Sequence, residues 1–438
     1  MQDLENNQKQ SNMQKVALTA LAGTSIEWYD FFLYGAAAAL IFPSAFFGEM
    51  PPTTALLLSL LTFAAGFIAR PIGGIIFGHF GDKVGRKKTL ISALMLMGIS
   101  STLIGLLPTY AMIGVAAPIL LTSLRFAQGL AIGGQWGGAM LLVTESAPSN
   151  QRGYYGAFAQ AGAPIGVILA NLALIITSAL VSEEFFNTWG WRIPFLASAV
   201  LILISMYIQL NLEDTDAFKA LVNNKGIQSD ENIKKSPVIE AIKKYPKRIF
   251  LAAGAFLSVQ VTFYILIAFM LAYGVTSANM ARDDMLAAVL IASAIMVPIQ
   301  FVFSSYSDRH GRKGIFMLGA VLTGIWAFAI FPLVDTGNFY LIVLAITGGL
   351  VFLAMMYGPQ AAFFTELFST EVRYSGATLG YQFGAIVGGA FAPTIAVKLW
   401  TEFDIIWVSA YIALASLLTL ISVMALTETY QSDLNNTD

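Results

Sequence analysis

The sequence "GHFGDKVGRKKTL", residues 78–90, and the related sequence "SDRHGRKGI", residues 307–315, decide how this chain is organised. Charged residues make up only 11% of the protein, yet five of them crowd into positions 82–88. Long apolar segments flank both sequences on either side. The two sequences align as Asp-[Lys/Arg]-x-Gly-Arg-Lys, so the same charged feature occurs once in each half of the chain.

The composition indicates a protein whose solvent is lipid. Of the 438 residues, 57% are hydrophobic and the mean hydropathy is +0.71, which is unlike a water-soluble domain. A membrane-spanning helix needs about 20 mostly apolar residues, and runs of that length are too long for barrel strands. The predicted fold class is an all-α membrane protein with twelve transmembrane helices, at 16–41, 54–77, 90–107, 111–144, 153–181, 191–210, 249–273, 285–306, 315–331, 339–365, 376–397 and 405–426.

The basic residues predict the orientation of these helices. Most of the 24 lysines and arginines lie in the N-terminal segment, after even-numbered helices or in the polar segment 213–247, whereas Arg70 and Arg125 fall inside helices. The positive-inside rule therefore places both termini in the cytoplasm of a multi-pass inner (plasma) membrane protein. The polar segment divides the chain into an N-terminal six-helix bundle (1–212), a cytoplasmic central loop (213–247) and a C-terminal six-helix bundle (248–438).

A second repeated pair supports an internal duplication. Glu145 precedes Arg152 by seven residues at the end of the fourth helix, and Glu366 precedes Arg373 by seven residues at the end of the tenth. Duplicated halves are a known construction of secondary transporters.

The repeated charges predict a gate at the cytoplasmic rim. A basic turn would suffice as a topology signal, but it would need neither an aspartate nor a fixed spacing. We expect carboxylates and cations at these helix ends to form pairs that each contribute about 1 kcal/mol or less. Together they would bias an equilibrium between two states. The predicted gating residues are Asp82, Arg86, Glu145, Arg152, Asp308, Arg312, Glu366 and Arg373.

Charges in the middle of helices are candidates for function, because each costs roughly 2.5–3.5 kcal/mol on insertion scales. Glu27 and Asp30 lie near the middle of helix 16–41 on one face, with Tyr34 one turn further on. Arg125 lies at similar depth in helix 111–144. We expect a carboxylate of the first helix to pair with Arg125; the alternative is a structural ion pair that merely joins the two helices.

Further polar side chains lie in the apolar runs. Amides and phenols suit hydroxyls and ring substituents, although hydrogen bonding between helices is an equal alternative for each of them. Besides Arg125, the predicted substrate-binding residues are Tyr34, Gln128, Gln135, Trp136, Gln160, Gln260, Tyr264, Tyr357, Gln360, Tyr381 and Gln382.

Several of these motifs resemble a known family. "GHFGDKVGRKK" and "RFAQG" (125–129) resemble signatures of the major facilitator superfamily. "IEWYDFFLYG" (26–35), "GGQWGGAMLLVTESAP" (133–148), "WGWRIPF" (189–195) and "TELFSTEVRYSGA" (365–377) are more similar to its metabolite:proton symporter family, and most similar to the shikimate-type branch. The resemblance implies two pseudo-symmetric six-helix bundles, the major facilitator fold, that work by alternating access. Family members commonly have a glutamate at Gln135, and an amide there cannot carry a proton.

The core charges predict how a proton and a substrate are coupled. Burial favours the neutral form of a carboxylic acid, whereas a nearby arginine favours the ionised form. A substrate carboxylate that competes for Arg125 would leave Asp30, or alternatively Glu27, to take up a proton. This predicts proton-coupled symport of a small organic acid, with a shikimate-like hydroxylated monocarboxylate favoured because one arginine suits one carboxylate. The alternatives are proton symport of a zwitterionic osmolyte (proline or betaine) or of a di- or tricarboxylate.

Other classes of function fit the sequence less well. The chain contains no phosphate-binding loop, no HExxH sequence and no cysteine, so we expect no enzyme activity, no cofactor and no metal site. A membrane receptor or channel is the non-transporter alternative, but a channel would not need the duplicated charges and a receptor would not explain charges at mid-depth. The net charge of −2 predicts no nucleic-acid partner. We expect a monomer whose partners are the lipid bilayer, protons and a small organic acid or zwitterion.

Overall fold

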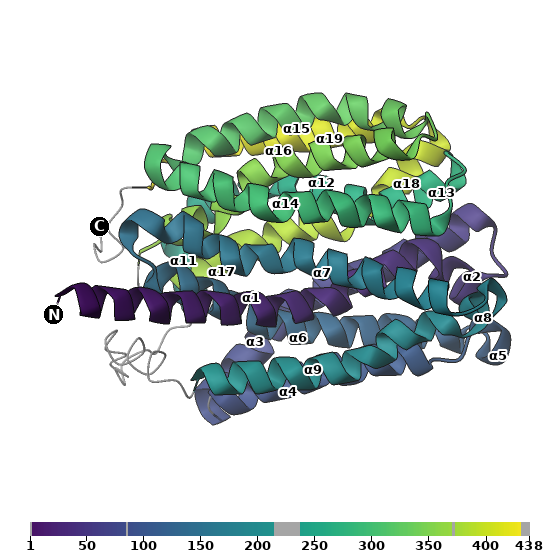
Figure 1. The fold of residues 1–438 in the computed structure, drawn as a ribbon, viewed down its shortest axis with the longest axis horizontal. Helices are drawn as coiled ribbons and strands as arrows, with labels where there is room; N and C mark the ends of the chain where they lie inside the picture. The colour runs from purple at the N-terminus through teal and green to yellow at the C-terminus, as the bar shows by residue number, and fades with distance from the viewer. Residues whose placement is uncertain (1, 85, 214–236, 370–372, 431–438) are drawn as a thin grey trace.

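The structure is a computed structural model that describes residues 2–84, 86–213, 237–369 and 373–430. Every regular element in these ranges is a helix, and the long helices run side by side along the long axis of the molecule (Figure 1). Among the described residues, ten helices are long and apolar enough to cross a membrane, and residues 91–106 form a shorter apolar helix. These observations confirm the predicted all-α membrane fold.

The first half of the chain forms six long helices and several short connecting ones. The long helices are α1 (Gln2–Leu40), α3 (Pro52–Val84), α4 (Arg86–Leu106), α6 (Ala116–Ser146), α7 (Arg152–Leu180) and α9 (Ile193–Glu213). The short ones are α2 (Phe42–Phe47), α5 (Tyr110–Ile113), α8 (Glu183–Thr188) and the 3-10 turns η1 (Ser149–Gln151) and η2 (Gly190–Arg192).

The second half also forms six spans, two of which contain a π-helical turn. The short helix α11 (Pro237–Lys244) precedes them. The seventh span consists of α12 (Pro246–Tyr264), η3 (Ile265–Phe269) and α13 (Met270–Thr276), and the eleventh of α17 (Arg373–Ala385), η4 (Ile386–Ala390) and α18 (Ala392–Glu402). The remaining spans are α14 (Arg282–His310), α15 (Arg312–Val334), α16 (Phe339–Glu366) and α19 (Ile406–Ala425).

The two halves repeat one pattern of helix pairing. In the first half α1 packs on α7, α3 on α6 and α4 on α9; in the second half α12 packs on α17, α14 on α16 and α15 on α19. Close packing of α3 on α6 depends on small residues, since a Cβ at Gly129 would lie 2.8 Å from the Cβ of Ala69. The exact division into 1–212, 213–247 and 248–438 stays a prediction, because most of the central loop lies outside the described residues.

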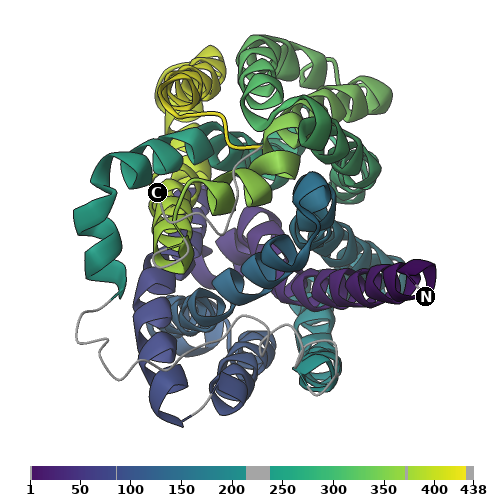
Figure 2. The ribbon, with the colours of Figure 1, turned by 90° about the vertical axis from the view of Figure 1, so that its left-hand side faces the viewer.

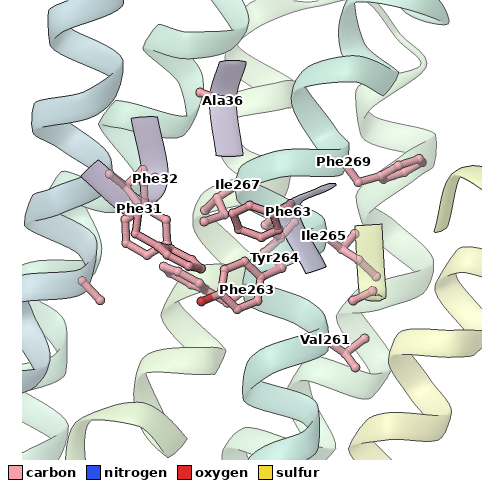
Figure 3. Packing of buried hydrophobic residues seen from close by; sticks show 14 of the residues in the cluster. Phe31, Phe32, Ala36, Phe63, Val261, Phe263, Tyr264, Ile265, Ile267 and Phe269 are labelled. Carbon is pink, nitrogen blue, oxygen red and sulfur yellow. The ribbon is translucent and has the colours of Figure 1, made fainter. Parts of the chain in front are cut away.

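The halves meet along two long contacts and through an aromatic cluster. Helix α7 packs on α14, and α3 packs on η4 and α18. Figure 2 shows the two sets of helices from one end, the first half in purple to blue and the second in green to yellow. Between them, Phe31 and Phe63 of the first half pack against Tyr264 of the second, with ring centroids 6.1 and 5.6 Å from the tyrosine ring (Figure 3).

One end of the bundle, which we call the basic end, collects both chain ends and many cations. Val16 in the first half of α1 packs with Tyr155 at the start of α7, and Lys313 Nζ donates a hydrogen bond of 2.8 Å to the carbonyl oxygen of Leu426, just after α19. Figure 1 shows this end on the left. The described cations there are Lys15, Arg152, Lys243, Lys244, Lys247, Arg248, Arg309, Arg312, Lys313 and Arg373.

Candidate functional site

Asp30 is a buried acid in the middle of α1. Its side chain is 1% exposed, and Oδ1 accepts a hydrogen bond from the hydroxyl of Ser198 on α9. The hydroxyl of Ser101 on α4 lies beside the same carboxyl group, while Oδ2 has no hydrogen-bond partner. Asp30 therefore has hydroxyls as its neighbours and keeps one oxygen available, which suits a group that gains and loses a proton.

Arg125 of α6 is fully buried in an aromatic cage. Its Cζ lies 4.2 Å from the ring centroids of Phe31 and Tyr34 and 4.7 Å from that of Phe63. Aromatic faces attract a guanidinium cation and so help to offset its loss of water. Nη1 donates a hydrogen bond of 3.0 Å to Gln128 Oε1, whereas Nε and Nη2 have no partner.

Asp30 and Arg125 are connected through two neutral side chains. Gln128 Nε2 donates a hydrogen bond of 2.7 Å to Ser101 Oγ, which lies beside the Asp30 carboxyl. Arg125, Gln128, Ser101 and Asp30 thus form what we call the acid–arginine chain. The expected direct ion pair between Arg125 and Asp30 is not formed in this structure, because α4 supplies Ser101 between the two helices that carry the charges.

The polar neighbours of Asp30 in α1, Tyr34 and Glu27, have other surroundings. Tyr34 lies one turn further along the helix, but its hydroxyl shares a hydrogen bond of 2.6 Å with Thr62 on α3. Glu27 is only half-buried, whereas Asp30 is almost completely enclosed. The structure therefore separates the two acids by environment as well as by position.

A second buried arginine, Arg70 of α3, lies in the same region and was given no role from the sequence. It is 1% exposed, and its Cζ is 4.4 Å from the ring centroids of Phe31 and Phe67 and 5.5 Å from that of Trp28. The sequence feature that could have identified Arg70 was a single charged residue within the apolar run 54–77. Because Arg125 also contacts Phe31, two guanidinium groups lie against one aromatic ring.

A small cavity of about 10 Å³ lies between the halves, and Trp28 in its lining also contacts Arg70. That volume accommodates about one water molecule, so an organic acid requires the halves to move apart. Its polar lining brings together four of the predicted substrate-binding residues with Trp28 of α1: Gln260, Tyr264, Tyr357 and Tyr381.

Other predicted binding residues are involved in contacts between helices. Gln160 of α7 donates a hydrogen bond of 3.2 Å to the carbonyl oxygen of Tyr357 and one of 3.5 Å to Gln360 Oε1, both on α16. Gln382 is 5% exposed, and its Oε1 has no hydrogen-bond partner. The side chains of Gln135 and Trp136 lie outside the described residues.

At the basic end, Asp308 of α14 joins the second half to the first. Its Oδ1 and Oδ2 accept hydrogen bonds of 2.8 Å from the backbone N–H groups of Gly153 and Tyr154, at the start of α7. An anion at a helix N-terminus is stabilised by the helix dipole and by unsatisfied N–H groups. Arg312 lies 2.6 Å from Asp308 and 3.1 Å from Glu366, so the carboxylates share one cation.

Two further ion pairs cross between the halves at this end. Arg373 lies 3.3 Å from Glu145, and Arg152 lies 3.9 Å from Glu366. Each pair joins the arginine of one repeated Glu…Arg motif to the glutamate of the other. We call Glu145, Arg152, Asp308, Arg312, Glu366 and Arg373 the latch; the side chains of the predicted members Asp82 and Arg86 lie outside the described residues.

The segment after α19 also contacts the latch, which the sequence did not indicate. Glu428 accepts hydrogen bonds of 3.0 and 2.9 Å from the backbone N–H groups of Arg312 and Lys313, at the start of α15. Thr429 donates a hydrogen bond of 2.8 Å to Glu366. This segment lies beyond the last apolar run, where hydropathy gives no signal.

The opposite end of the interface between α7 and α14 is closed as well. The hydroxyl of Ser178 donates a hydrogen bond of 2.7 Å to Asp283, and the Asn171 amide donates one of 3.2 Å to the carbonyl oxygen of Leu286. The interface is therefore in contact at both ends, and the central charges between these ends are buried.

Comparisons with known proteins agree on a family. The family described as Major Facilitator Superfamily matches residues 20–378. The inner membrane metabolite transport protein YhjE of Escherichia coli (strain K12) is 40% identical over 432 residues, which cover 97% of this chain and 96% of the relative. The shikimate transporter of the same strain is 37% identical over 405 residues, covering 92% of each chain.

A solved structure shares the fold. The partially occluded inward-open conformation of the xylose transporter XylE from E. coli superposes with a TM-score of 0.71 at 17% sequence identity. The match covers 97% of this chain and 100% of that chain. At this identity the similarity concerns the fold alone.

Proposed function

Because the chain belongs to the major facilitator superfamily, we propose that it carries a small organic acid across the membrane together with a proton. The observation that carries this proposal is the acid–arginine chain, which joins Asp30 and Arg125 through neutral side chains in the core of the first half. The tendency of a buried acid linked in this way to bind a proton changes when an anion offsets the positive charge of its arginine. We assign Asp30 as the group that carries the proton.

Loading begins when the end opposite the latch opens. The Nε and Nη2 groups of Arg125, which have no partner in the structure, attract an anion. An anion beside Arg125 reduces the positive potential that stabilises ionised Asp30, and Asp30 then takes up a proton through its unpartnered Oδ2. Because each event favours the other, an organic anion and a proton load together.

The latch controls which end opens. The hydrogen bonds of Asp308 to α7 and the pairs Arg152–Glu366 and Arg373–Glu145 cross between the halves, so they exist only while the basic end is closed. We take the structure, which is in contact at both ends, to be the occluded state. It opens at the basic end when these pairs break while the contacts of Asp283 and Leu286 with α7 keep the opposite end closed. Pairs of modest strength allow this exchange without trapping either state.

The favoured substrate is a hydroxylated monocarboxylic acid of the shikimate type. The cavity lining supplies the hydroxyls of Tyr264, Tyr357 and Tyr381 and the amide of Gln260, which suit ring hydroxyls. The relationship to a shikimate transporter supports this choice. A second candidate is a zwitterion such as betaine, because Trp28 and the tyrosines of the same cavity present aromatic faces that attract a quaternary ammonium group.

We place the basic end in the cytoplasm, with both termini on that side. The support is the concentration of arginines and lysines there, as the positive-inside rule requires. In this orientation the inner membrane proton gradient drives uptake into the cell.

Uptake into proteoliposomes tests the function. Labelled shikimate should accumulate in vesicles when the external pH is lower than the internal pH, and accumulation should disappear when a protonophore is added. Labelled betaine in parallel vesicles distinguishes the second candidate. Accumulation of neither compound, or accumulation of shikimate that is unaffected by the protonophore, would contradict proton-coupled uptake of this acid.

A further inference from the structure

The middle of the molecule contains one more buried cation than the coupling mechanism uses. Among the described residues, the charged side chains that are at least nine-tenths buried at mid-depth are Asp30, Arg70 and Arg125. Arg125 is directed towards Asp30 by the acid–arginine chain. Among the residues that the structure describes, Arg70 has no anionic partner, and its Nε and Nη2 make no hydrogen bond.

We infer that Arg70, together with the hydroxyls of Tyr264 and Tyr381, forms the subsite that holds the carboxylate of the substrate. This inference rests on the proposed function and identifies the residues that recognise the acid group. In this arrangement Arg70 binds the carboxylate directly. The bound anion also offsets the positive charge of Arg125, which lies against the same Phe31 ring, and Arg125 thereby links the substrate charge to Asp30.

The surroundings of Arg70 leave its edge available to a ligand. Phe31, Phe67 and Trp28 lie within 5.5 Å of its Cζ and present apolar rings to the guanidinium. Its hydrogen-bonding capacity is in the plane of the group, where N–H donors fit the two oxygens of a carboxylate. A buried guanidinium whose Nε and Nη2 lack partners is costly, and a bound carboxylate would remove that cost.

Charge balance indicates a ligand with a single negative charge. The three deeply buried groups carry two positive charges and, with Asp30 ionised, one negative charge. One carboxylate at Arg70 completes the balance before Asp30 takes up its proton, whereas a second would exceed it. A monocarboxylate is therefore the class of substrate that this subsite accepts at the first step of loading.

The subsite spans both halves of the molecule. Arg70 is on α3, whereas Tyr264 on α12 and Tyr381 on α17 belong to the second half, and both hydroxyls lie beside its guanidinium. Trp28, Tyr264 and Tyr381 contact Arg70 on one side and line the central cavity on the other. A carboxylate bound there would draw the halves together, and the rest of the molecule would occupy the enlarged cavity.

Binding to the purified full-length protein tests the subsite. We would titrate wild type and variants with shikimate and with shikimate methyl ester, which keeps the ring but lacks the charge. Arg70→Lys should weaken shikimate binding at least about 10-fold and Arg70→Gln at least about 100-fold, because lysine keeps the charge but loses the planar fork. Binding of the ester should change less than about threefold in either variant.

A matched control and a milder variant separate recognition from folding. Arg192 is also a buried arginine over an aromatic ring, 4.3 Å from the Trp191 centroid, but it lies at the opposite end and donates to the carbonyl oxygens of Leu107 and Thr188. Arg192→Gln should leave the shikimate affinity unchanged. The double variant Tyr264→Phe/Tyr381→Phe removes only two hydroxyls and should weaken binding at least about 10-fold.

The outcomes distinguish this inference from the proposed function. Shikimate affinity within about twofold of wild type in Arg70→Gln, or in the double tyrosine variant, overturns the subsite. An equal loss in Arg192→Gln also overturns it, because the effect would then be general. If wild type binds no shikimate, the proposed substrate is wrong, and acetate then tests the carboxylate subsite by itself. Acetate should raise the melting temperature of wild type but not that of Arg70→Gln. Equal stabilisation of both proteins refutes the subsite.

Discussion

Replacing Asp308 with asparagine should open the basic end. The carboxylate accepts two backbone hydrogen bonds from the start of α7 and pairs with Arg312, and asparagine keeps only one of its oxygens. A hydrogen bond to a charged group contributes about 1.5–3 kcal/mol, and a charge at a helix N-terminus about 0.3–1 kcal/mol. Since asparagine keeps part of these contacts, we expect a net loss of about 2 kcal/mol.

This loss acts on the conformational equilibrium rather than on the pocket. The contacts to α7 cross between the halves, so they stabilise only states that are closed at the basic end. About 2 kcal/mol corresponds to a shift of about 30-fold in the ratio of closed to open molecules. Transport should slow, because most molecules of the variant are open at the basic end. The substrate affinity measured at equilibrium should change less than the transport rate.

Distances between spin labels measure this shift directly. The chain has no cysteine, so a pair of labels can be introduced at Asn150 and Lys243, exposed on the two sides of the basic end, without removing native thiols. A second pair at Glu184 and Asn338 reports on the opposite end. In Asp308→Asn the first distance should lengthen in most molecules and the second should not.

A neighbouring charge provides the control for this experiment. Arg309 is exposed in the same last turn of α14, so Arg309→Gln changes the local charge without removing a contact to α7. It should leave both distance distributions unchanged. The reasoning is refuted if Asp308→Asn gives the wild-type distribution at the basic end, or if Arg309→Gln opens that end as much.

Three further predictions concern the other contacts between the halves and the acid–arginine chain. Asp283→Asn weakens the hydrogen bond with Ser178 and should shift the equilibrium towards opening of the end opposite the latch. The shift should be less than about fivefold, because Asp283 is 43% exposed. If spin labels at that end do not move apart, this prediction is contradicted. Glu145 and Arg373 lie 3.3 Å apart, so reversing the charge of either one places like charges side by side and should lower uptake at least about fivefold. The double reversal restores opposite charges and should recover much of the uptake; recovery no better than in the single variants would show that the two residues do not act as a pair. Gln128→Leu interrupts the acid–arginine chain and should reduce accumulation driven by a pH gradient more than substrate exchange at equal pH; equal loss of both would show that the chain is only structural.

The fold was predictable because apolar length and a repeated charge motif are properties of local sequence. The run 249–273 indeed forms a single span, but its π-helical turn at Ile265–Phe269 was not predicted. A π turn depends on how a helix packs against its neighbours, and hydropathy alone does not contain that information.

The central charges were predictable, but their partners were not. Asp30 and Arg125 were identified because a charge in an apolar helix is rare. Their connection through Gln128 and Ser101 depends on the rotation and height of α4, which are set by packing. Arg70 carried the same signal but had no partner in the sequence to suggest a role.

The latch shows a third limit. The repeated spacing identified Glu145 with Arg152 and Glu366 with Arg373, but a repeat does not say which copies meet. The structure pairs Arg152 with Glu366 and Arg373 with Glu145, because the helix ends that meet at the interface come from different halves. The binding and gating roles of these residues stay proposals until variants are measured.

The most direct test of the central claim is paired uptake and exchange by Asp30→Asn in proteoliposomes with labelled shikimate. Asparagine resembles the protonated acid and keeps an oxygen for the hydrogen bond from Ser198, so the fold should survive. We predict that accumulation driven by a pH gradient is lost while exchange of internal for external shikimate continues, because exchange needs no net movement of protons. Glu27→Gln, measured in parallel, should still accumulate shikimate. Accumulation by Asp30→Asn at the wild-type level would contradict Asp30 as the proton carrier, and its loss only in Glu27→Gln would transfer that role to Glu27.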